Sequence, residues 1–474
     1  MSSFDNLFSM IPAHPLGIKP SGNAYMDIHH KQHHRSLGTF ELLPHEILIQ
    51  VLEFLNHSAL SALGQTCKVL LAFTRQDDLW KTLFIRDRTA PLEWLGTWRA
   101  TYLGLSSSHI ARITCDNLFS DTLYRPFFCT HVPLDPFART IPSHNQILRL
   151  EDLSEDEFSK SWTKTPFILT NPVRSWKLFK TWSTEELVKR YGNIQFRAEA
   201  VDWPLLVYVE YMERNSDESP LYLFDRGFVE KMNIKVGEPD GDYTIPDCFK
   251  ADYFSALGKE RPDHRWLIMG PERSGSTFHK DPNATSAWNA VIRGSKYWIM
   301  FPSSALCPPP PGVFVSEDQS EVTSPLSIAE WLVNFHAEAR RVEGCIEGIC
   351  YEGEILHVPS GWWHLVVNLS PAIAITQNFV PRAHLPAVLK FLKDNTADQV
   401  SGFKAEIEDP YALFVRRMEE RYPEVLDEAI KCLGNNGSRK KRKWEELCKV
   451  DNEVPGTNRG FSFGFGADED AEIP

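Results

Sequence analysis

Two residues of types that commonly bind metal ions, His279 and Asp281, stand two positions apart in FHKDP. On an extended strand such residues share one face, so both side chains can reach one metal ion. A third candidate ligand, His364 in GEILHVPSGWWHLVVNL, is expected on the second arm of a hairpin turned at 359–361. Two histidines and a carboxylate form a facial triad, which leaves positions open on Fe(II) for a 2-oxo acid and dioxygen. The spacing alone is common, and the alternative is two core histidines with a surface aspartate.

An inward-pointing lysine adds to this pattern. Two expected strands, 288–293 and 296–301, flank a tight turn at Gly294-Ser295 and place Lys296 on the face of Trp298 and Met300, the inside of a barrel. A buried lysine needs an anion, which the far carboxylate of a dicarboxylic cosubstrate would supply. Thr376 in AIAITQNF offers a hydroxyl partner. The alternative is a lysine that extends to the barrel rim.

Composition sets outer limits on the function. A chain of 474 residues is long enough for two or three domains, and its net charge of −13 argues against a protein that coats nucleic acid by bulk electrostatics. The nine cysteines include no CxxC pair, which favours a reducing compartment. No apolar run of about 18 residues and no basic leader followed by an apolar segment occurs, so we expect neither a membrane-spanning nor a secreted protein.

Short amphipathic helices are predicted between residues 39 and 86. The first begins near Pro44, the second is expected to be capped by Ser58, and the third opens at Asp77-Asp78. The ordered string LPHEILIQVLEFL, LSALGQTCKVL and LWKTLF resembles the F-box. That resemblance implies docking on a Skp-type adaptor of cullin ubiquitin ligases, and the alternative is a structural lid. The expected docking stripe consists of Ile47, Leu48, Val51, Leu52 and Leu55.

Other segments have simpler patterns. We expect a strand within 165–173, a helix over 181–192 capped by Ser183, and a strand over 204–213. Helices are expected over 385–395 and 409–433, with Asp409-Pro410 at the start of the latter. The first 38 residues, which include a histidine run at 29–34, are expected to be a disordered arm. The basic block 439–443 is typical of nuclear import signals, and the acidic tail after it is expected to be disordered.

Four segments together carry a family resemblance: FHKDP, SAWNAVIRGSKYWIMFP, GEILHVPSGWWH and AITQNF. Over residues 165–382 the chain resembles the JmjC dioxygenases, in particular the arginine demethylase and lysyl-hydroxylase branch. The resemblance implies an α+β fold: a double-stranded β-helix (cupin/JmjC jelly roll) with an N-terminal helical F-box and C-terminal helices. The expected divisions are an arm at 1–38, F-box at 39–86, connector at 87–164, barrel at 165–382, helices at 383–433 and tail at 434–474.

Carried over position by position, the resemblance makes His279, Asp281 and His364 the Fe(II) ligands. It makes Lys296 the partner of the distal carboxylate of 2-oxoglutarate, assisted by Thr376. Three further residues match positions that approach the cosubstrate or the metal in this family: Tyr222, Ser276 and Asn289. Ser276 replaces the usual threonine and keeps the hydroxyl group. The segment 307–350 departs most from the family pattern, so substrate identity is the least transferable property.

The resemblance thus implies an enzyme that uses Fe(II), 2-oxoglutarate and O2 on protein lysine or on methylated arginine or lysine. We expect a nuclear location, with cytoplasm as a further compartment, and a protein substrate with basic side chains. In the family the C-terminal helices pack a homodimer, and closure of the barrel end is the alternative here. The competing hypothesis is a non-catalytic F-box substrate receptor whose barrel only binds protein.

Overall fold

The computed structural model describes residues 10–26, 34–87, 93–106, 113–116, 118–238, 240–303, 308–316, 322–325, 327–396 and 399–433. Contacts divide the chain into two units, residues 1–421 and 422–474. The first unit holds both sheets and every element named below, and the second contains a helical stretch at 423–433. Residues 29–33 of the histidine run, the basic block 439–443 and the acidic tail lie outside the described residues.

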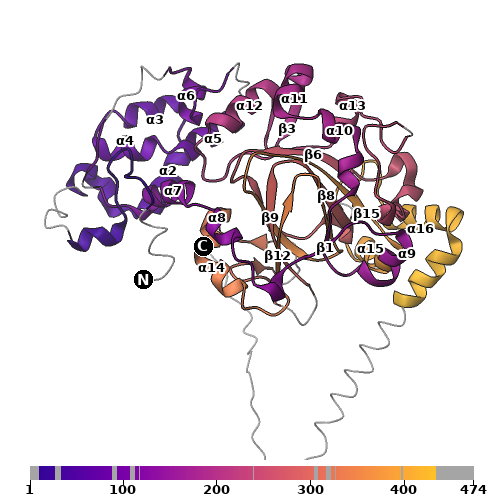
Figure 1. Cartoon of the computed structure of the whole chain (residues 1–474). Coiled ribbons are helices and arrows are strands. Elements are labelled where there is room, and N and C mark those ends of the chain that lie inside the picture. The colour runs from indigo at the N-terminus through magenta and orange to yellow at the C-terminus, as the bar shows by residue number, and fades with distance from the viewer. Residues whose placement is uncertain are drawn as a thin grey trace, which may run out of the picture. The chain divides into compact units, whose positions relative to one another are not determined.

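Most strands of the first unit belong to two sheets that face each other (Figure 1). The larger sheet has the order β1-β2-β13-β8-β15-β6-β5-β3-β4, the smaller has the order β12-β9-β14-β7, and β10 and β11 form a separate two-stranded sheet. The strands are Leu148–Leu150 (β1), Phe167–Leu169 (β2), Gln195–Ala198 (β3), Val201–Pro204 (β4), Leu223–Asp225 (β5), Arg265–Gly270 (β6), Gly275–His279 (β7), Ser286–Arg293 (β8), Ser295–Phe301 (β9), Phe314–Val315 (β10), Val322–Thr323 (β11), Ile346–Tyr351 (β12), Ile355–Val358 (β13), Trp363–Asn368 (β14) and Ala372–Phe379 (β15).

The chain passes repeatedly from one sheet to the other, and this creates the double-stranded β-helix predicted from the sequence. Between β8 in the larger sheet and β9 in the smaller, the link is the single residue Gly294, with φ of 83°. A Cβ at Gly294 would lie 2.3 Å from the carbonyl oxygen of Pro371, so only glycine fits this crossing. The expected hairpin at 359–361 is wrong in one respect, because β13 and β14 lie in different sheets and the turn joins the two sheets instead of pairing its own arms.

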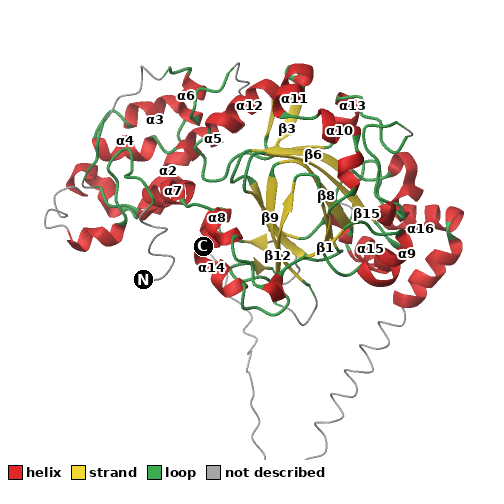
Figure 2. Ribbon diagram, viewed as in Figure 1, coloured by secondary structure: helices red, strands yellow, loops and turns green. Residues whose placement is uncertain are grey.

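Helices cover the outer faces of both sheets (Figure 2). The α14 helix packs on the outside of the smaller sheet, where Trp331 lies in one buried cluster with Ile299 and Leu365. The helices are His45–Glu53 (α2), His57–Leu63 (α3), Lys68–Thr74 (α4), Asp77–Arg86 (α5), Trp98–Leu103 (α6), Asp121–His131 (α7), Asp135–Ala138 (α8), Glu155–Glu157 (α9), Lys177–Thr181 (α10), Thr184–Tyr191 (α11), Leu205–Arg214 (α12), Phe228–Lys231 (α13), Ile328–Ala339 (α14), Leu385–Asp394 (α15) and Pro410–Arg421 (α16).

Local signals predicted several of these helices, and one segment was assigned wrongly. Ser183 caps α11 as expected, and Asp409 accepts a hydrogen bond from the backbone N–H of Ala412 at the start of α16. The segment 204–213, expected as a strand, forms α12 with Pro204 at its N-cap. Its apolar residues are buried on most sides, and for such a short apolar run periodicity cannot separate helix from strand.

The N-terminal region contains one more helix than expected. The predicted second helix is two helices, α3 and α4, and the side chain that caps α3 is Asn56, not Ser58. The expected docking stripe is also divided: Leu48 and Leu52 are 0% and 1% exposed and belong to the core. Leu42 and Phe54 are 85% and 88% exposed, and Ile47 and Val51 are exposed as well.

Aromatic side chains join these N-terminal helices to the barrel region. Trp98 of α6 lies with its ring centre 5.6 Å from that of Trp203 on β4 and 5.9 Å from that of Tyr211 on α12. The buried Asp217 carboxylate accepts hydrogen bonds from Trp98 Nε1 over 2.8 Å and from the Tyr211 hydroxyl over 2.7 Å. Because burial of large aromatic rings is strongly favourable, this junction holds the two regions together.

Candidate active site

The two candidate histidine ligands meet across adjacent strands of the smaller sheet. His279 on β7 is paired in register with His364 on β14, and their ring centres are 4.1 Å apart. The register shifts by one residue between this pair and the pair Ser276–Val366. This β-bulge lets both Ser276 and His279 line the barrel cavity, which strict alternation along β7 would forbid.

Backbone contacts fix which ring nitrogen of each histidine is free. His279 Nδ1 lies 2.8 Å from the carbonyl oxygen of Thr277, and His364 Nδ1 lies 3.1 Å from that of Trp362. A carbonyl only accepts, so each Nδ1 carries the proton and each Nε2 presents a lone pair. Burial lowers the pKa of both imidazoles to about 4, so both are neutral at pH 7. This is the state in which histidine binds metals.

The third candidate ligand, Asp281, lies beyond the end of β7 and not on it. It precedes the short 3₁₀ helix Pro282–Ala284, so the strand alternation expected from the sequence does not position it. Its carboxylate nevertheless lines the same cavity, where its Oδ2 atom is buried and has no hydrogen-bond partner in the part of the chain that the structure describes. Burial raises the pKa of Asp281 to about 6, and an Asn378 side-chain hydrogen bond opposes that shift. A cation would satisfy the unpaired oxygen.

The cavity shared by these three side chains has a volume of about 430 Å³. Across the described part of the chain, no three His, Cys, Asp or Glu side chains are close enough as they stand to form a complete metal site. The donor set nonetheless fits iron: two neutral imidazoles with free Nε2 atoms, and one carboxylate with an unsatisfied oxygen. A metal held by these three would retain open positions facing the cavity.

Lys296 is fully buried inside the barrel, as predicted. It lies on β9, 0% exposed, and its Nζ atom donates to the Tyr222 hydroxyl over 2.5 Å and to Asn368 Oδ1 over 2.9 Å. Burial lowers the pKa of Lys296 to about 7. Neither partner is an anion, so among the described residues the ammonium has no hydrogen-bonded countercharge, and a bound carboxylate would provide one.

The remaining predicted residues line the same cavity, and two of them come from the opposite sheet. Thr376 on β15 is paired in register with Asn289 on β8, and both line the cavity together with Tyr222 and Ser276. The Thr376 hydroxyl donates to the carbonyl oxygen of Trp288 over 2.9 Å and not to Lys296. The Asn289 side-chain oxygen is buried without a partner, so this amide is also open to a ligand.

Two asparagines have roles that the sequence did not assign. Asn368 on β14 is the hydrogen-bond acceptor for Lys296. Asn378, two residues after Thr376, donates to the Thr285 hydroxyl over 2.7 Å and contacts Asp281. Asn368 and Asn378 follow His364 and Thr376 by an even number of residues, so strand alternation places them on the same faces. This spacing is the sequence signal that could have predicted their roles.

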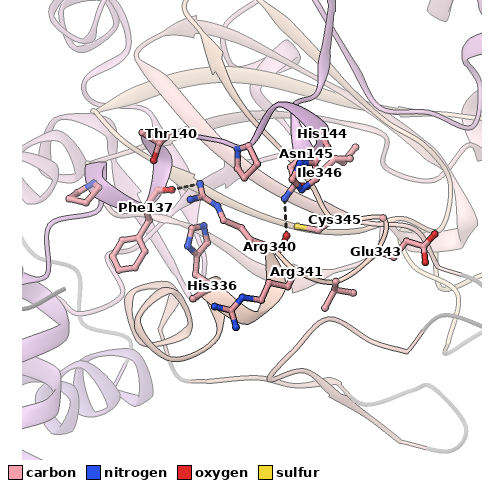
Figure 3. Close-up of a pocket in the computed structure, with 15 residues that line it drawn as sticks. Phe137, Thr140, His144, Asn145, His336, Arg340, Arg341, Glu343, Cys345 and Ile346 are labelled. Atoms are coloured by element: carbon pink, nitrogen blue, oxygen red, sulfur yellow. Dashed lines mark hydrogen bonds between the residues drawn. The ribbon is translucent and has the colours of Figure 1, made fainter. Parts of the chain in front are cut away.

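A larger cavity, of about 800 Å³, lies outside the barrel beside the end of α14 (Figure 3). Arg340 donates to the carbonyl oxygen of Phe137 at its wall, and Asn145 donates to the carbonyl oxygen of Arg340. The same guanidinium pairs with the buried carboxylate of Glu347, which also accepts from Tyr297. These groups satisfy one another, so this cavity does not gather an incomplete donor set as the barrel does.

Comparison with known proteins supports the assignment of both regions. A family model described as a cupin-like domain matches residues 209–384, and one described as F-box-like matches residues 40–86. The arginine-specific demethylase JMJ22 of Arabidopsis thaliana is 35% identical over 432 residues, which cover 89% of this chain and 84% of that protein. The chain belongs to the JmjC family of iron- and 2-oxoglutarate-dependent oxygenases.

The bifunctional arginine demethylase and lysyl-hydroxylase psr-1 of Caenorhabditis elegans is 34% identical over 262 residues, 52% of this chain and 64% of that protein. The 2-oxoglutarate and iron-dependent oxygenase JMJD4 of Danio rerio is 31% identical over 224 residues, covering 44% of this chain and 47% of that protein.

This JmjC oxygenase is therefore an enzyme that uses Fe(II), 2-oxoglutarate and O2, and it carries an F-box-like domain. Iron with the 2-oxo acid supplies the oxidising chemistry. The barrel supplies the neutral imidazoles, the carboxylate and the buried ammonium that would hold these groups. The alternative of a barrel that only binds protein is not favoured. In the described ranges, no helix is both long and apolar enough to cross a membrane.

Proposed function

We propose that this JmjC oxygenase acts on basic side chains of proteins, hydroxylating lysine or removing methyl groups from arginine or lysine. The observation that carries the proposal is the likeness to an arginine-specific demethylase along 89% of the chain, through both the F-box-like and the cupin-like regions. Hydroxylation of a side-chain carbon gives a stable alcohol. Hydroxylation of an N-methyl carbon gives a product that loses formaldehyde, so one oxidant accounts for both reactions.

Within this proposal each cavity residue has a specific task. His279, Asp281 and His364 hold the iron through Nε2, a carboxylate oxygen and Nε2. Lys296 binds the distal carboxylate of 2-oxoglutarate, and Tyr222 and Asn368 orient the ammonium through the hydrogen bonds already present. Asn289, Ser276 and Thr376 line the remainder of the cosubstrate cavity.

The direct test is incubation of the full chain with iron, 2-oxoglutarate and peptides that carry lysine, methyl-lysine or methylarginine. Mass spectrometry distinguishes the products, because hydroxylation adds one oxygen and demethylation removes one methylene. The expected result is one of these changes, with succinate formed in equal amount. Succinate formation without a modified peptide of any of the three classes would contradict the proposed substrate.

We further propose that the F-box-like region binds a Skp-type adaptor through the exposed apolar side chains of Leu42, Ile47, Val51 and Phe54. Exposure of Phe54 and Leu42 to more than four-fifths is unusual for large apolar residues close together in the chain, and such patches commonly mark protein interfaces. This set replaces the stripe expected from helical periodicity, because Leu48 and Leu52 face the core. Co-purification with a Skp-type adaptor tests the proposal.

We also propose that the protein acts in the nucleus, on the basis of the basic block Arg439 to Lys443 in an otherwise acidic chain. Replacing these five residues with alanine and imaging the tagged protein tests the location. Unchanged nuclear accumulation would remove the block as the cause. A homodimer through the C-terminal helices stays a prediction, and the oligomeric mass in solution tests it.

A further inference from the structure

A second cavity is lined in part by His279, one of the proposed iron ligands. It has a volume of about 350 Å³ and is lined by Glu199, Glu218, Arg273 and the β7 segment that contains Ser276 and His279. Ser276 and His279 also line the cosubstrate cavity. The two cavities therefore share one wall, and that wall carries the residue proposed to bind iron.

The two cavities differ in their polar groups. Tyr222, Asn289 and Thr376 line only the cosubstrate cavity, together with Asp281 and His364. The second cavity holds none of these and instead presents two carboxylates from separate parts of the chain. Because the cosubstrate is itself an anion that needs Lys296, an acidic cavity is unsuited to it.

Each carboxylate retains capacity for another donor. Glu199 is exposed, and its Oε1 atom accepts one backbone N–H, that of Tyr222, over 3.1 Å. The surrounding protein removes part of the water around this carboxyl group, which raises the pKa of Glu199; the Lys81 charge opposes the shift and the Asp217 charge adds to it. Glu218 pairs through Oε1 with Arg125 over 2.5 Å. Ionised carboxylates accept up to about four hydrogen bonds, so neither is saturated.

The cavity's own cation, Arg273, is held by the backbone, and its charge also interacts with that of Glu218. Arg273 donates from Nη1 to the carbonyl oxygen of Val132 over 2.6 Å and from Nη2 to that of Cys129. Its two Nη atoms thus bind carbonyls at the C-terminal end of α7, and among the described residues its buried Nε atom has no hydrogen-bond partner. Lys81, whose charge lowers the pKa of Glu199, lies near Asp217 at 3.9 Å.

We propose that the basic side chain of the protein substrate reaches the iron through this second cavity, where Glu199 and Glu218 bind its positive charge. The inference rests on the proposed function and adds a location and two specificity residues to it. The shared wall carries the argument, because a cationic group bound by these carboxylates lies next to His279 and Ser276. The cosubstrate then binds in the other cavity, so substrate and cosubstrate do not compete for space.

The test is binding of a labelled peptide to the iron- and 2-oxoglutarate-loaded protein under nitrogen, where no turnover occurs. The double variant Glu199→Gln/Glu218→Gln keeps the side-chain shapes and removes both charges. We expect it to bind a lysine or methylarginine peptide at least about tenfold more weakly, the usual loss for hydrogen bonds to charged groups. A peptide with norleucine at the target position should bind the wild type and the variant equally.

Arg125→Gln is the matched control, because it breaks the same Arg125–Glu218 ion pair with the opposite effect on charge. It should leave cationic-peptide affinity unchanged or raise it, whereas a merely structural role for the ion pair predicts a loss in both variants. Glu213→Gln, an exposed acidic residue of α12, controls for general surface charge. If the wild type binds and the double variant binds equally well, the cavity assignment alone is overturned. If the wild type neither binds nor modifies any cationic peptide, the proposed function is overturned with it.

Discussion

Lys296 and Asn368 lie directly opposite one another on β9 and β14, and the lysine Nζ atom donates to the asparagine Oδ1 atom over 2.9 Å. The Asn368 amide group is held in turn, since its Nδ2 atom donates to the Ser274 hydroxyl over 2.9 Å. The ammonium is therefore oriented before any cosubstrate arrives, and less ordering remains to be done on binding.

Removal of the ammonium should selectively weaken cosubstrate binding. We expect Lys296→Ala to reduce 2-oxoglutarate affinity by about 2–5 kcal/mol, the typical cost of losing one partner of a buried charge pair. Iron content should stay near the wild-type value, because the metal ligands are unaffected. Calorimetric titration checks the affinity, and an unaltered value would mean that the cosubstrate carboxylate lies elsewhere.

A negative charge at position 368, where Asn368 accepts the hydrogen bond from Lys296, should weaken cosubstrate binding. In Asn368→Asp the new carboxylate pairs with Lys296, so the 2-oxoglutarate carboxylate meets a neutralised lysine and a like charge. We expect about tenfold or greater weakening of 2-oxoglutarate binding. Ser274→Ala is the control, since it removes a hydrogen bond of Asn368 and adds no charge. Equal losses in the two variants would attribute the effect to packing alone.

Cosubstrate binding should depend on pH through Lys296. Burial lowers the pKa of Lys296 from 10.5 to about 7 in the free protein, and a bound carboxylate favours the charged form. Above pH 7 binding must then take up a proton, so affinity falls as pH rises, by up to about tenfold per pH unit. The stability of the cosubstrate-free protein should instead rise with pH. Between pH 7 and 10.5 the Lys296 side chain is protonated in the unfolded chain and not in the folded chain, so the free energy of unfolding increases with pH in this range.

The proton uptake is measured by calorimetry in two buffers with different ionisation enthalpies. Lys296→Met should abolish the dependence in this range, which separates Lys296 from other titrating groups. Binding heats that are the same in both buffers for the wild type would show that no proton is exchanged.

Removal of a proposed iron ligand should abolish iron binding and leave the fold intact. We expect Asp281→Ala and His364→Ala to lose iron and all 2-oxoglutarate turnover while the melting temperature changes little, because neither side chain forms part of the apolar core. His144→Ala, which changes an exposed histidine at the wall of the outer cavity, should keep both. A variant that retains iron and wild-type turnover would remove that residue from the ligand set.

The adaptor surface should be separable from the fold. Val51→Glu together with Phe54→Glu should abolish co-purification with a Skp-type adaptor and leave thermal stability and oxygenase turnover unchanged, since both side chains are exposed. Leu48→Ala changes a side chain with 0% exposure and should instead lower stability by about 2–5 kcal/mol. Retained adaptor binding in the double glutamate variant would place the contact elsewhere.

The sequence predicted the barrel interior better than the way its parts connect. Lys296, Trp298 and Met300 lie inside the barrel as alternation along a strand requires, because burial on one face strongly specifies register. The sequence did not reveal the bulge before His279 or the position of Asp281 beyond the strand end. These depend on which strands are neighbours, and the hydrogen bonds that decide this come from residues far away in the chain.

The apolar stripe of α2 shows a related limit. Helical periodicity identifies residues on one side of a helix, but it cannot say which of them a neighbouring helix covers. Here Leu48 and Leu52 face the core while Ile47 and Val51, one position before each, stay exposed.

The single-residue crossing at Gly294 has a consequence for how this enzyme can fail. The proposed iron ligands come from the smaller sheet and the turn that follows it, whereas Thr376 and Asn289 come from the larger sheet, and the chain passes between the sheets with little slack. Separating the sheets would divide the iron ligands and Lys296 from Thr376 and Asn289, so a molecule whose sheets have come apart lacks a complete site. Heat or denaturant should therefore not release a fragment that still consumes 2-oxoglutarate. In a cell, a partly unfolded molecule of this enzyme would be inactive and would not oxidise other molecules.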